Sequence, residues 1–203
     1  MARAGILGGT FNPPHVGHVA CAQAGLAALG LDLVTLVPAG APPHKPVPGD
    51  PGPEHRLEMC CRAVTGDERL EVSGVELRRA GPSFTVDTLA ALHAERPEDE
   101  LTFIAGGDMA AALPRWREPE RVLELARFAV AQRPGTGRDE IERALAGLRG
   151  RDRVVFFDMA PVEVSSTMVR AAVAEGSPWR WLVPDAVGDY IEAEGLYGAR
   201  EAA

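Results

Sequence analysis

The chain has 203 residues, of which 46% are hydrophobic and 25% are charged, a composition typical of one globular domain with a well-buried core. Its 21 Lys and Arg against 29 Asp and Glu give a net charge of -8, which argues against a general DNA- or RNA-binding role, because such proteins present an extended basic face. No apolar run is long enough to span a bilayer, and the first residues leave no room for a signal peptide. We therefore expect a cytoplasmic protein with no membrane and no nucleic-acid partner.

Apolar runs alternate with helix-forming segments along the whole chain. The expected strands are the run that ends at residue 7, then 31–38, 70–79 (a strand pair or one interrupted strand), 101–105, 128–131 and 154–157. The expected helices cover 19–29, 54–64, 86–95, 109–113, 120–126, 140–148, 168–175 and 186–194. This order predicts one Rossmann-like α/β domain over 1–203, with a mostly parallel sheet and helices on both faces. Residues 198–203 are expected to form a frayed tail.

The first predicted strand runs into a turn with the sequence GGTFNPPHVGH, residues 8–18. Its glycines let a ligand approach the backbone closely, and the helix that follows offers free N–H groups to a phosphate. His15 and His18 are three residues apart and therefore lie on one side of the first helical turn. The segment is neither a Walker A loop nor GxGxxG, but the order of strand, glycine-rich turn and helix predicts a phosphate-binding site.

The same two histidines and Cys21 are spaced like metal ligands on successive helical turns. No fourth ligand lies nearby in the sequence, and a metal site would need neither Gly17 nor the Pro-Pro turn. We therefore expect no metal ion held by protein side chains. The 3 cysteines, an odd number without CxxC spacing, are expected to be buried thiols and not a disulfide framework.

A parallel α/β sheet binds ligands beyond the carboxyl ends of its strands. Gly106-Gly107-Asp108 follows a predicted strand and suits a ribose site, although Asp108 is equally suited to be the N-cap of the next helix. We expect four segments that follow strands to share one face of the domain: 8–18, 39–46, 105–108 and 160–167.

A second candidate anion site lies near the other end of the chain. Ser165-Ser166-Thr167 begins a predicted helix, and Arg170 lies one turn further along. The alternative is ordinary helix capping beside a solvated Arg170. Together with the HxGH element at 15–18, this SSTxxR segment resembles the paired signatures of the nucleotidylyltransferase superfamily, in which it closes the site over the β- and γ-phosphates of ATP.

Further segments occur in the order found in the bacterial nicotinate-nucleotide adenylyltransferase family, and the resemblance covers essentially the whole chain through Tyr197. It implies transfer of the AMP moiety of ATP to nicotinate mononucleotide, with Mg²⁺ coordinated mainly by ATP phosphates and water, in a homodimer. The attacking phosphate oxygen is already anionic, so no general base and no covalent intermediate are implied. The segments are Pro42-Pro43-His44-Lys45, Pro82-Ser83-Phe84-Thr85, Gly106-Gly107-Asp108, Trp116 before Glu118-Pro119, and Arg133-Pro134-Gly135.

The resemblance also implies roles for individual residues. His18 would bond to the α-phosphate with His15 assisting, and Arg170 would hold the leaving pyrophosphate, so these three would be catalytic. Contacts to ATP would come from Gly8, Gly9, Thr10, Phe11, His18, Gly106, Asp108, Ser165, Ser166, Thr167 and Arg170. Contacts to the nicotinate nucleotide would come from Lys45, Thr85, Trp116 and Arg133, with Trp116 stacked on the pyridine ring.

Three positions depart from the family pattern. Asn12 stands where many members have Asp, Phe84 where tyrosine is often found, and Arg117 where an aromatic residue can occur. The nearest alternative is a sister adenylyltransferase whose acceptor is phosphopantetheine or nicotinamide mononucleotide. An alternative of another class is a non-catalytic nucleotide-binding sensor, which would bind ATP without turnover.

Overall fold

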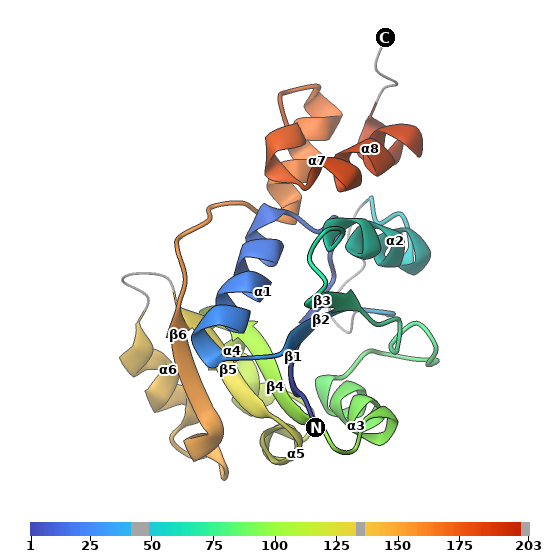
Figure 1. The fold of residues 1–203 in the computed structure, drawn as a ribbon. Coiled ribbons are helices and arrows are strands. Elements are labelled where there is room, and N and C mark those ends of the chain that lie inside the picture. The colour runs from blue at the N-terminus through green and yellow to red at the C-terminus, as the bar shows by residue number, and fades with distance from the viewer. Residues whose placement is uncertain (42–48, 133–136, 200–203) are drawn as a thin grey trace.

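The computed structural model describes residues 1–41, 49–132 and 137–199, and its centre is a six-stranded sheet (Figure 1). The strand order is β3-β2-β1-β4-β5-β6, and every neighbouring pair is parallel. This is the doubly wound order, with its switch point between β1 and β4, and it confirms the predicted Rossmann-like α/β class. The strands are β1 (Arg3–Gly9), β2 (Leu33–Pro38), β3 (Leu70–Val72), β4 (Glu100–Gly106), β5 (Arg127–Gln132) and β6 (Val154–Asp158).

Helices cover both faces of the sheet, as predicted. One face packs against α1 and α2, and the other packs against α3, α4, α5 and α6. Helices α7 and α8 pack on α2 and stand beyond the end of the sheet (Figure 1). The helices are α1 (Val16–Leu29), α2 (Pro53–Ala63), α3 (Thr85–Glu95), α4 (Gly107–Ala112), α5 (Pro119–Leu125), α6 (Arg138–Leu145), α7 (Ser166–Glu175) and α8 (Asp185–Ala193), with short 3-10 helices η1 (Leu113–Arg115), η2 (Arg151–Arg153), η3 (Arg180–Leu182) and η4 (Leu196–Gly198).

Strand β1 shows why the layers form as they do. Successive side chains of a strand point to opposite faces, so Ile6 packs toward α3 to α6 and Leu7 toward α1. Both side chains are buried, as expected for a strand covered on two faces. A Cβ at Gly5 would lie 2.7 Å from the Val34 side chain, so glycine is required where β1 and β2 pack tightly.

The predicted strand over 70–79 is only partly present. Strand β3 ends at Val72 and lies at the edge of the sheet, as the alternation of its residues predicted. The chain then turns, because the carbonyl of Gly74 accepts the N–H groups of Leu77 and Arg78 at 3.0 Å and 3.3 Å. The second half of the prediction is therefore wrong. The apolar alternation continues through this part of the sequence. Its backbone N–H groups, however, bond to carbonyls three or four residues earlier in the same segment and not to a neighbouring strand.

The three cysteines are free thiols that differ in exposure. Cys60 is buried, Cys21 is half-buried and Cys61 is exposed. The prediction of buried thiols is wrong for Cys61, because the core side of α2 is formed by Met59, Cys60 and Ala63, which leaves Cys61 on the outer side.

No helix in the described parts of the chain is long and apolar enough to cross a membrane.

Candidate active site

The carboxyl ends of the central strands meet at one edge of the sheet. In the pairing register, Gly9 of β1 lies opposite Pro38 of β2, and Gly106 of β4 lies opposite Ala131 of β5. The turns that follow these strands therefore leave the sheet at the same level. The register of β1 with β4, in which Leu7 lies opposite Ile104, brings both pairs to the same edge. This confirms the predicted convergence for the described residues of 8–18, 39–46 and 105–108.

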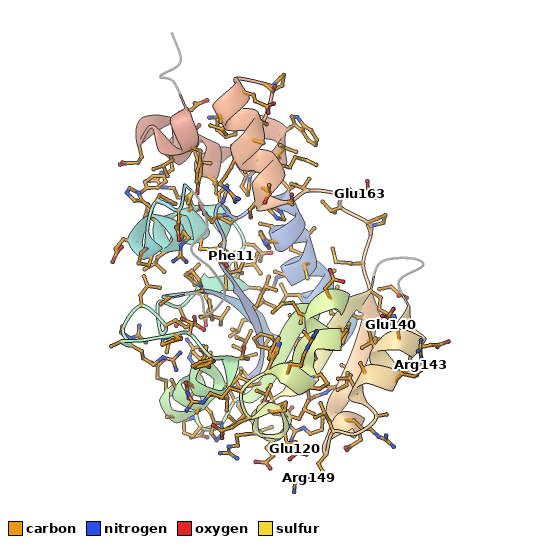
Figure 2. All side chains as sticks on the ribbon, turned by 180° about the vertical axis from the view of Figure 1, so that it is seen from behind. Phe11, Glu120, Glu140, Arg143, Arg149 and Glu163 are labelled. Atoms are coloured by element: carbon orange, nitrogen blue, oxygen red, sulfur yellow. The ribbon has the colours of Figure 1, made fainter. Side chains whose placement is uncertain are left out.

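The β1–α1 turn, residues 10–15, is shaped around the ring of Phe11. This residue has φ 52°, a left-handed conformation that non-glycine residues rarely adopt, and it is 2% exposed. A Cβ at Gly9 would lie 3.1 Å from the Phe11 ring, so glycine is what fits beneath it. The edge of the ring contacts His18, with centroids 4.8 Å apart. Figure 2 shows Phe11 where the sheet meets the α7–α8 pair.

The two histidines at the start of α1 are held in a fixed arrangement. His15 is the N-cap residue, and its ring stacks on that of His18 with centroids 3.7 Å apart. A Cβ at Gly17 would lie 3.1 Å from the His15 ring, which gives the glycine of HxGH a steric reason. The backbone N–H of His15 donates to Nδ1 of His18 at 3.1 Å. Neutral His18 therefore carries its ring hydrogen on Nε2 and can donate it to a ligand.

Burial and the neighbouring His15 lower the pKa of His18 to about 3, from the ordinary 6.5. His18 is thus a neutral imidazole in the free protein at physiological pH. Its effect on a bound phosphate would come from a directed N–H group and not from a full positive charge. The first turn of α1, to which His18 belongs, also offers backbone N–H groups to an anion.

The lowered pKa of His18 predicts that the protein loses stability in acid. The unfolded chain binds a proton at this residue near pH 6.5, whereas the folded chain does not until about pH 3, so falling pH favours the unfolded state through that interval. Between pH 7.5 and pH 5 we expect this histidine to cost up to about 2 kcal/mol. Urea unfolding of the wild type and His18→Asn at both pH values measures the effect. Equal losses in the two proteins would contradict it.

The start of α7 is bonded directly to the β1–α1 turn. Ser165 is the N-cap, and its Oγ accepts a backbone N–H from the first turn of the helix at 3.2 Å. The hydroxyl of Ser166 donates to the carbonyl of Pro13 at 2.8 Å. The helix capping that the sequence allowed as an alternative is therefore present at Ser165, and it coexists with contact between the two predicted anion-binding segments.

Arg170 reaches the same turn from one helical turn further along α7. Its Nη1 donates to the carbonyl of Asn12 at 2.6 Å, and its Nη2 donates to the Thr167 hydroxyl at 3.3 Å. A guanidinium has five N–H donors, so these bonds do not exhaust it. His15, His18 and Arg170, which lie far apart in the sequence, are thereby gathered around one turn.

The end of β4 presents the predicted ribose segment to this edge of the sheet. Gly106 is the N-cap of α4, and Asp108 is exposed at the second position of that helix. The alternative prediction that Asp108 is the N-cap is wrong, because the helix begins at Gly107, two residues earlier than expected. The Asp108 carboxylate is thus available at the helix N-terminus, where negative charge is favoured.

At the same edge of the sheet, the segment after β2 is bonded to the segment that leads into α3. The Ser83 hydroxyl oxygen accepts the backbone N–H groups of Gly40 and Ala41 at 3.1 Å and 3.2 Å. Thr85 follows directly as the first residue of α3 and is half-buried. Lys45 and Arg133, the other charged residues predicted to contact the nucleotide, lie outside the described residues.

Trp116 packs on the core, and the residue after it contacts the segment that leads into α3. Its half-buried ring packs edge-on against Phe103 and Phe128, with centroids 5.8 Å and 5.9 Å away. The next residue, Arg117, places its guanidinium carbon 4.9 Å from the centre of the Phe84 ring. The Arg117 departure from the family pattern therefore brings a cation to the ring that stands in place of the frequent tyrosine.

Sequence reasoning missed Arg56 of α2, whose side chain is 1% exposed. Its Nη1 donates to the carbonyls of Thr10, at 3.1 Å, and Ala39, and its Nη2 donates to the carbonyl of Gly40 at 3.2 Å. Its Nε donates to the Asp50 carboxylate at 3.0 Å. One guanidinium thus joins the turn after β1 to the segment after β2.

A sequence signal for Arg56 does exist. It shares a helical face with Met59, Cys60 and Ala63, all buried, so its spacing places it on the apolar stripe of α2. A buried arginine needs acceptors on every side. Here the acceptors are backbone carbonyls at the ends of strands, which no sequence pattern marks.

Comparison with known proteins gives the same assignment at the level of family. Residues 6–172 match a family model described as cytidylyltransferase-like. The protein named "Probable nicotinate-nucleotide adenylyltransferase" from Roseiflexus sp. (strain RS-1) is 45% identical over 95% of this chain and 96% of its own length. The protein of the same name from Shouchella clausii (strain KSM-K16) is 39% identical over 98% of both chains.

Solved structures share the fold. Nicotinic acid mononucleotide adenylyltransferase from Plasmodium falciparum, solved in complex with APC and in complex with NaAD, matches with a TM-score of 0.77 over 100% of both chains. The identities of 16% and 17% support the architecture alone. The curated relatives carry the assignment further, because they match at 39% to 45% identity over nearly their whole length, and the chain belongs to the nicotinate-nucleotide adenylyltransferase family.

Proposed function

We propose that the protein transfers the AMP moiety of ATP to nicotinate mononucleotide, giving nicotinate adenine dinucleotide and pyrophosphate. Family membership supports the reaction. The observation that carries it is the arrangement at the start of α1. There a neutral His18 keeps its Nε2–H for a ligand at the N-terminus of the helix, and Arg170 is bonded to the turn that leads into this helix. This arrangement suits an anionic ligand.

The proposed chemistry needs orientation and charge stabilisation. The attacking phosphate oxygen of the nucleotide is already anionic, so no side chain has to remove a proton from it. The Nε2–H of His18 would donate to an oxygen of the α-phosphate as negative charge builds there, with His15 and the α1 N-terminus assisting. Displacement would be in line, without a covalent intermediate.

The leaving pyrophosphate would be held from α7. Arg170 and Ser166 bond to the β1–α1 turn. The remaining donors of Arg170, with Ser165, Ser166, Thr167 and the first N–H groups of α7, would bond to the pyrophosphate. The described residues include no group of three or more His, Cys, Asp or Glu side chains placed to hold a metal ion, and the hydroxyls that they do offer suit a hydrated cation. Mg²⁺ would be held mainly by ATP phosphates and water, and would neutralise phosphate charge.

The remaining contacts follow from position at the edge of the sheet. Asp108 at the end of β4 would bond to the ATP ribose, and the glycines of β1 would let the phosphates approach its backbone. Thr85, Trp116, Lys45 and Arg133 would bind the nicotinate nucleotide. By the same family resemblance we propose a cytoplasmic homodimer, which sedimentation velocity would test.

Trp116→Ala is expected to raise KM for nicotinate mononucleotide by about tenfold, because the loss of one ring-on-ring contact costs about 1 kcal/mol or slightly more. The KM for ATP should change little. Steady-state kinetics with each substrate varied in turn measures both constants. An effect confined to ATP would mean that the pyridine ring binds elsewhere.

Trp181→Ala is the matched control for that variant. Trp181 is 68% exposed, and its ring N–H bonds to the carbonyl of Pro178 in its own segment. It should leave both KM values unchanged. Unfolding midpoints of the two variants would show how much of the Trp116 effect comes from lost packing on Phe103 and Phe128.

The function itself is tested by pyrophosphate release from ATP and Mg²⁺ with a single acceptor present. Nicotinate mononucleotide, nicotinamide mononucleotide and phosphopantetheine would each be supplied alone. Strong preference for the first is expected. Preference for another acceptor would keep the phosphate site and overturn the roles given to Thr85 and Trp116. Binding of ATP without release in any mixture would overturn the enzymatic assignment.

A further inference from the structure

A residue near the end of the described chain is bonded to the β1–α1 turn near its start. In η4, the Tyr197 hydroxyl donates to Oδ1 of Asn12 at 2.6 Å, across 185 residues of sequence. Asn12 is 2% exposed and lies in the β1–α1 turn. The tyrosine oxygen also lies 4.0 Å from Sδ of Met59 in α2. A residue at the edge of the expected frayed tail thus contacts the β1–α1 turn of the site.

The backbone at Tyr197 suggests that this contact is specifically maintained. Its φ of 59° and ψ of 16° lie in the left-handed region, which is unfavourable for a residue with a side chain. Gly195 precedes this short helix, and Gly198 is its last residue. Burial raises the pKa of the Tyr197 hydroxyl, so the group remains a hydrogen-bond donor at physiological pH.

The side chain of Asn12 depends on this tyrosine for its orientation. Its Nδ2 is buried and has no hydrogen-bond partner among the described residues. The bond from Tyr197 to Oδ1 therefore decides which way the amide lies. The backbone carbonyl of Asn12 is the one that Arg170 bonds to at 2.6 Å, so the same residue receives both groups from the C-terminal part of the chain.

Asn12 also lies between the groups that place the histidines. Phe11, on one side, contacts the His18 ring with its edge. Pro13, on the other side, accepts the Ser166 hydroxyl and leads through Pro14 into His15. A shift of Asn12 would therefore move the histidines and Arg170 relative to each other.

We propose that Tyr197 is a positioning residue for adenylyl transfer, which acts through Asn12 to hold His18 and Arg170 in the geometry of the reacting phosphates. Its hydroxyl is engaged with Asn12 and acts through that residue. The expected effect rests on the function proposed above. Misplacement of groups that act in the transition state lowers kcat, whereas the nicotinate nucleotide and the ribose of ATP are held by other residues. The variant should therefore lower kcat far more than it raises either KM.

The test compares Tyr197→Phe with Tyr190→Phe. Tyr190 of α8 also bonds through its hydroxyl, to Nδ1 of His55 at 2.8 Å, but no hydrogen bond or ring contact joins it to the β1–α1 turn. Each variant loses one hydroxyl and one hydrogen bond in the same part of the fold. We expect Tyr197→Phe to lower kcat about tenfold, with both KM values within about twofold of wild type. Tyr190→Phe should leave kcat within about twofold of wild type.

A second variant tests whether the Tyr197 hydroxyl lowers or maintains kcat through Asn12. Asn12→Asp keeps the acceptor at Oδ1 and gives it a charge, which strengthens the bond from Tyr197. Adding Tyr197→Phe to Asn12→Asp should therefore lower kcat by a larger factor than adding it to the wild type. Equal factors in the two backgrounds would mean that the hydroxyl does not act through Asn12 and would overturn the proposal.

The other outcomes are equally decisive. A Tyr197→Phe protein with wild-type kcat would overturn the positioning role, as would equal loss of kcat in both tyrosine variants in proportion to lost unfolding stability. A wild-type protein without turnover would instead refute the proposed function. The two failures are distinguishable, because only the second appears before any residue is changed.

Discussion

Replacing His18 by alanine is expected to lower kcat for adenylyl transfer by about 100-fold to 1,000-fold, the usual cost of removing one directed donor from a developing oxyanion. The Nε2–H of His18 would be lost, and because the lowered pKa keeps His18 neutral in the free protein, that form loses no positive charge with it. The KM values for both substrates should change much less, because the donor acts chiefly as charge builds on the α-phosphate. Single-turnover measurement of nicotinate adenine dinucleotide formation isolates this step from product release.

His93→Ala is the matched control for the histidine substitution. His93 is exposed in the last turn of α3 and should leave kcat unchanged. His18→Gln is informative in addition, since its amide offers a donor without a ring, and partial recovery of kcat is expected. Near-normal turnover by His18→Ala would exclude His18 from catalysis, and the phosphate would then be stabilised by Arg170 and helix N–H groups alone.

The sequence predicts the fold well wherever a local pattern and the tertiary structure agree. The runs at β1, β2 and β4 are mainly apolar, with one buried threonine in each of the last two, which suits strands covered on both faces. Each strand ends in glycine or proline. The strand predicted over 70–79 is wrong in its second half, because there the local pattern and the tertiary structure disagree. Its alternation of apolar residues fits a strand, but Gly74 allows a turn whose hydrogen bonds are local.

The candidate site likewise has features that the sequence predicts and features that only the structure shows. The HxGH and SSTxxR segments are recognisable because strand–turn–helix geometry requires those residue types in consecutive positions. The hydrogen on Nε2 of His18 is not recognisable from sequence, because it depends on the bond from the His15 backbone and on burial. The contacts of Asn12 with Arg170 and Tyr197 join residues at opposite ends of the chain, which only the fold brings together.

Arg56→Met is expected to lower the free energy of unfolding by about 3–5 kcal/mol, because it breaks a buried ion pair and leaves buried acceptors without donors. The methionine fills most of the volume, so the cost comes from polar groups and not from a cavity. The carbonyls of Ala39 and Gly40 and the Asp50 carboxylate would lose their partner. Urea unfolding at neutral pH measures the loss.

Arg62→Met on the same helix separates this effect from helix propensity and net charge. Arg62 pairs with Glu58 at 2.8 Å, but its side chain is 40% exposed, so its removal should cost less than about 1 kcal/mol. Arg56→Lys keeps the charge and loses the forked geometry, and should fall between the two methionine variants. Equal stability of Arg56→Met and Arg62→Met would mean that water satisfies the strand-end carbonyls when the guanidinium is gone. The two strand ends would then be joined by the bond from the Ala39 N–H to the Gly9 carbonyl without help from α2.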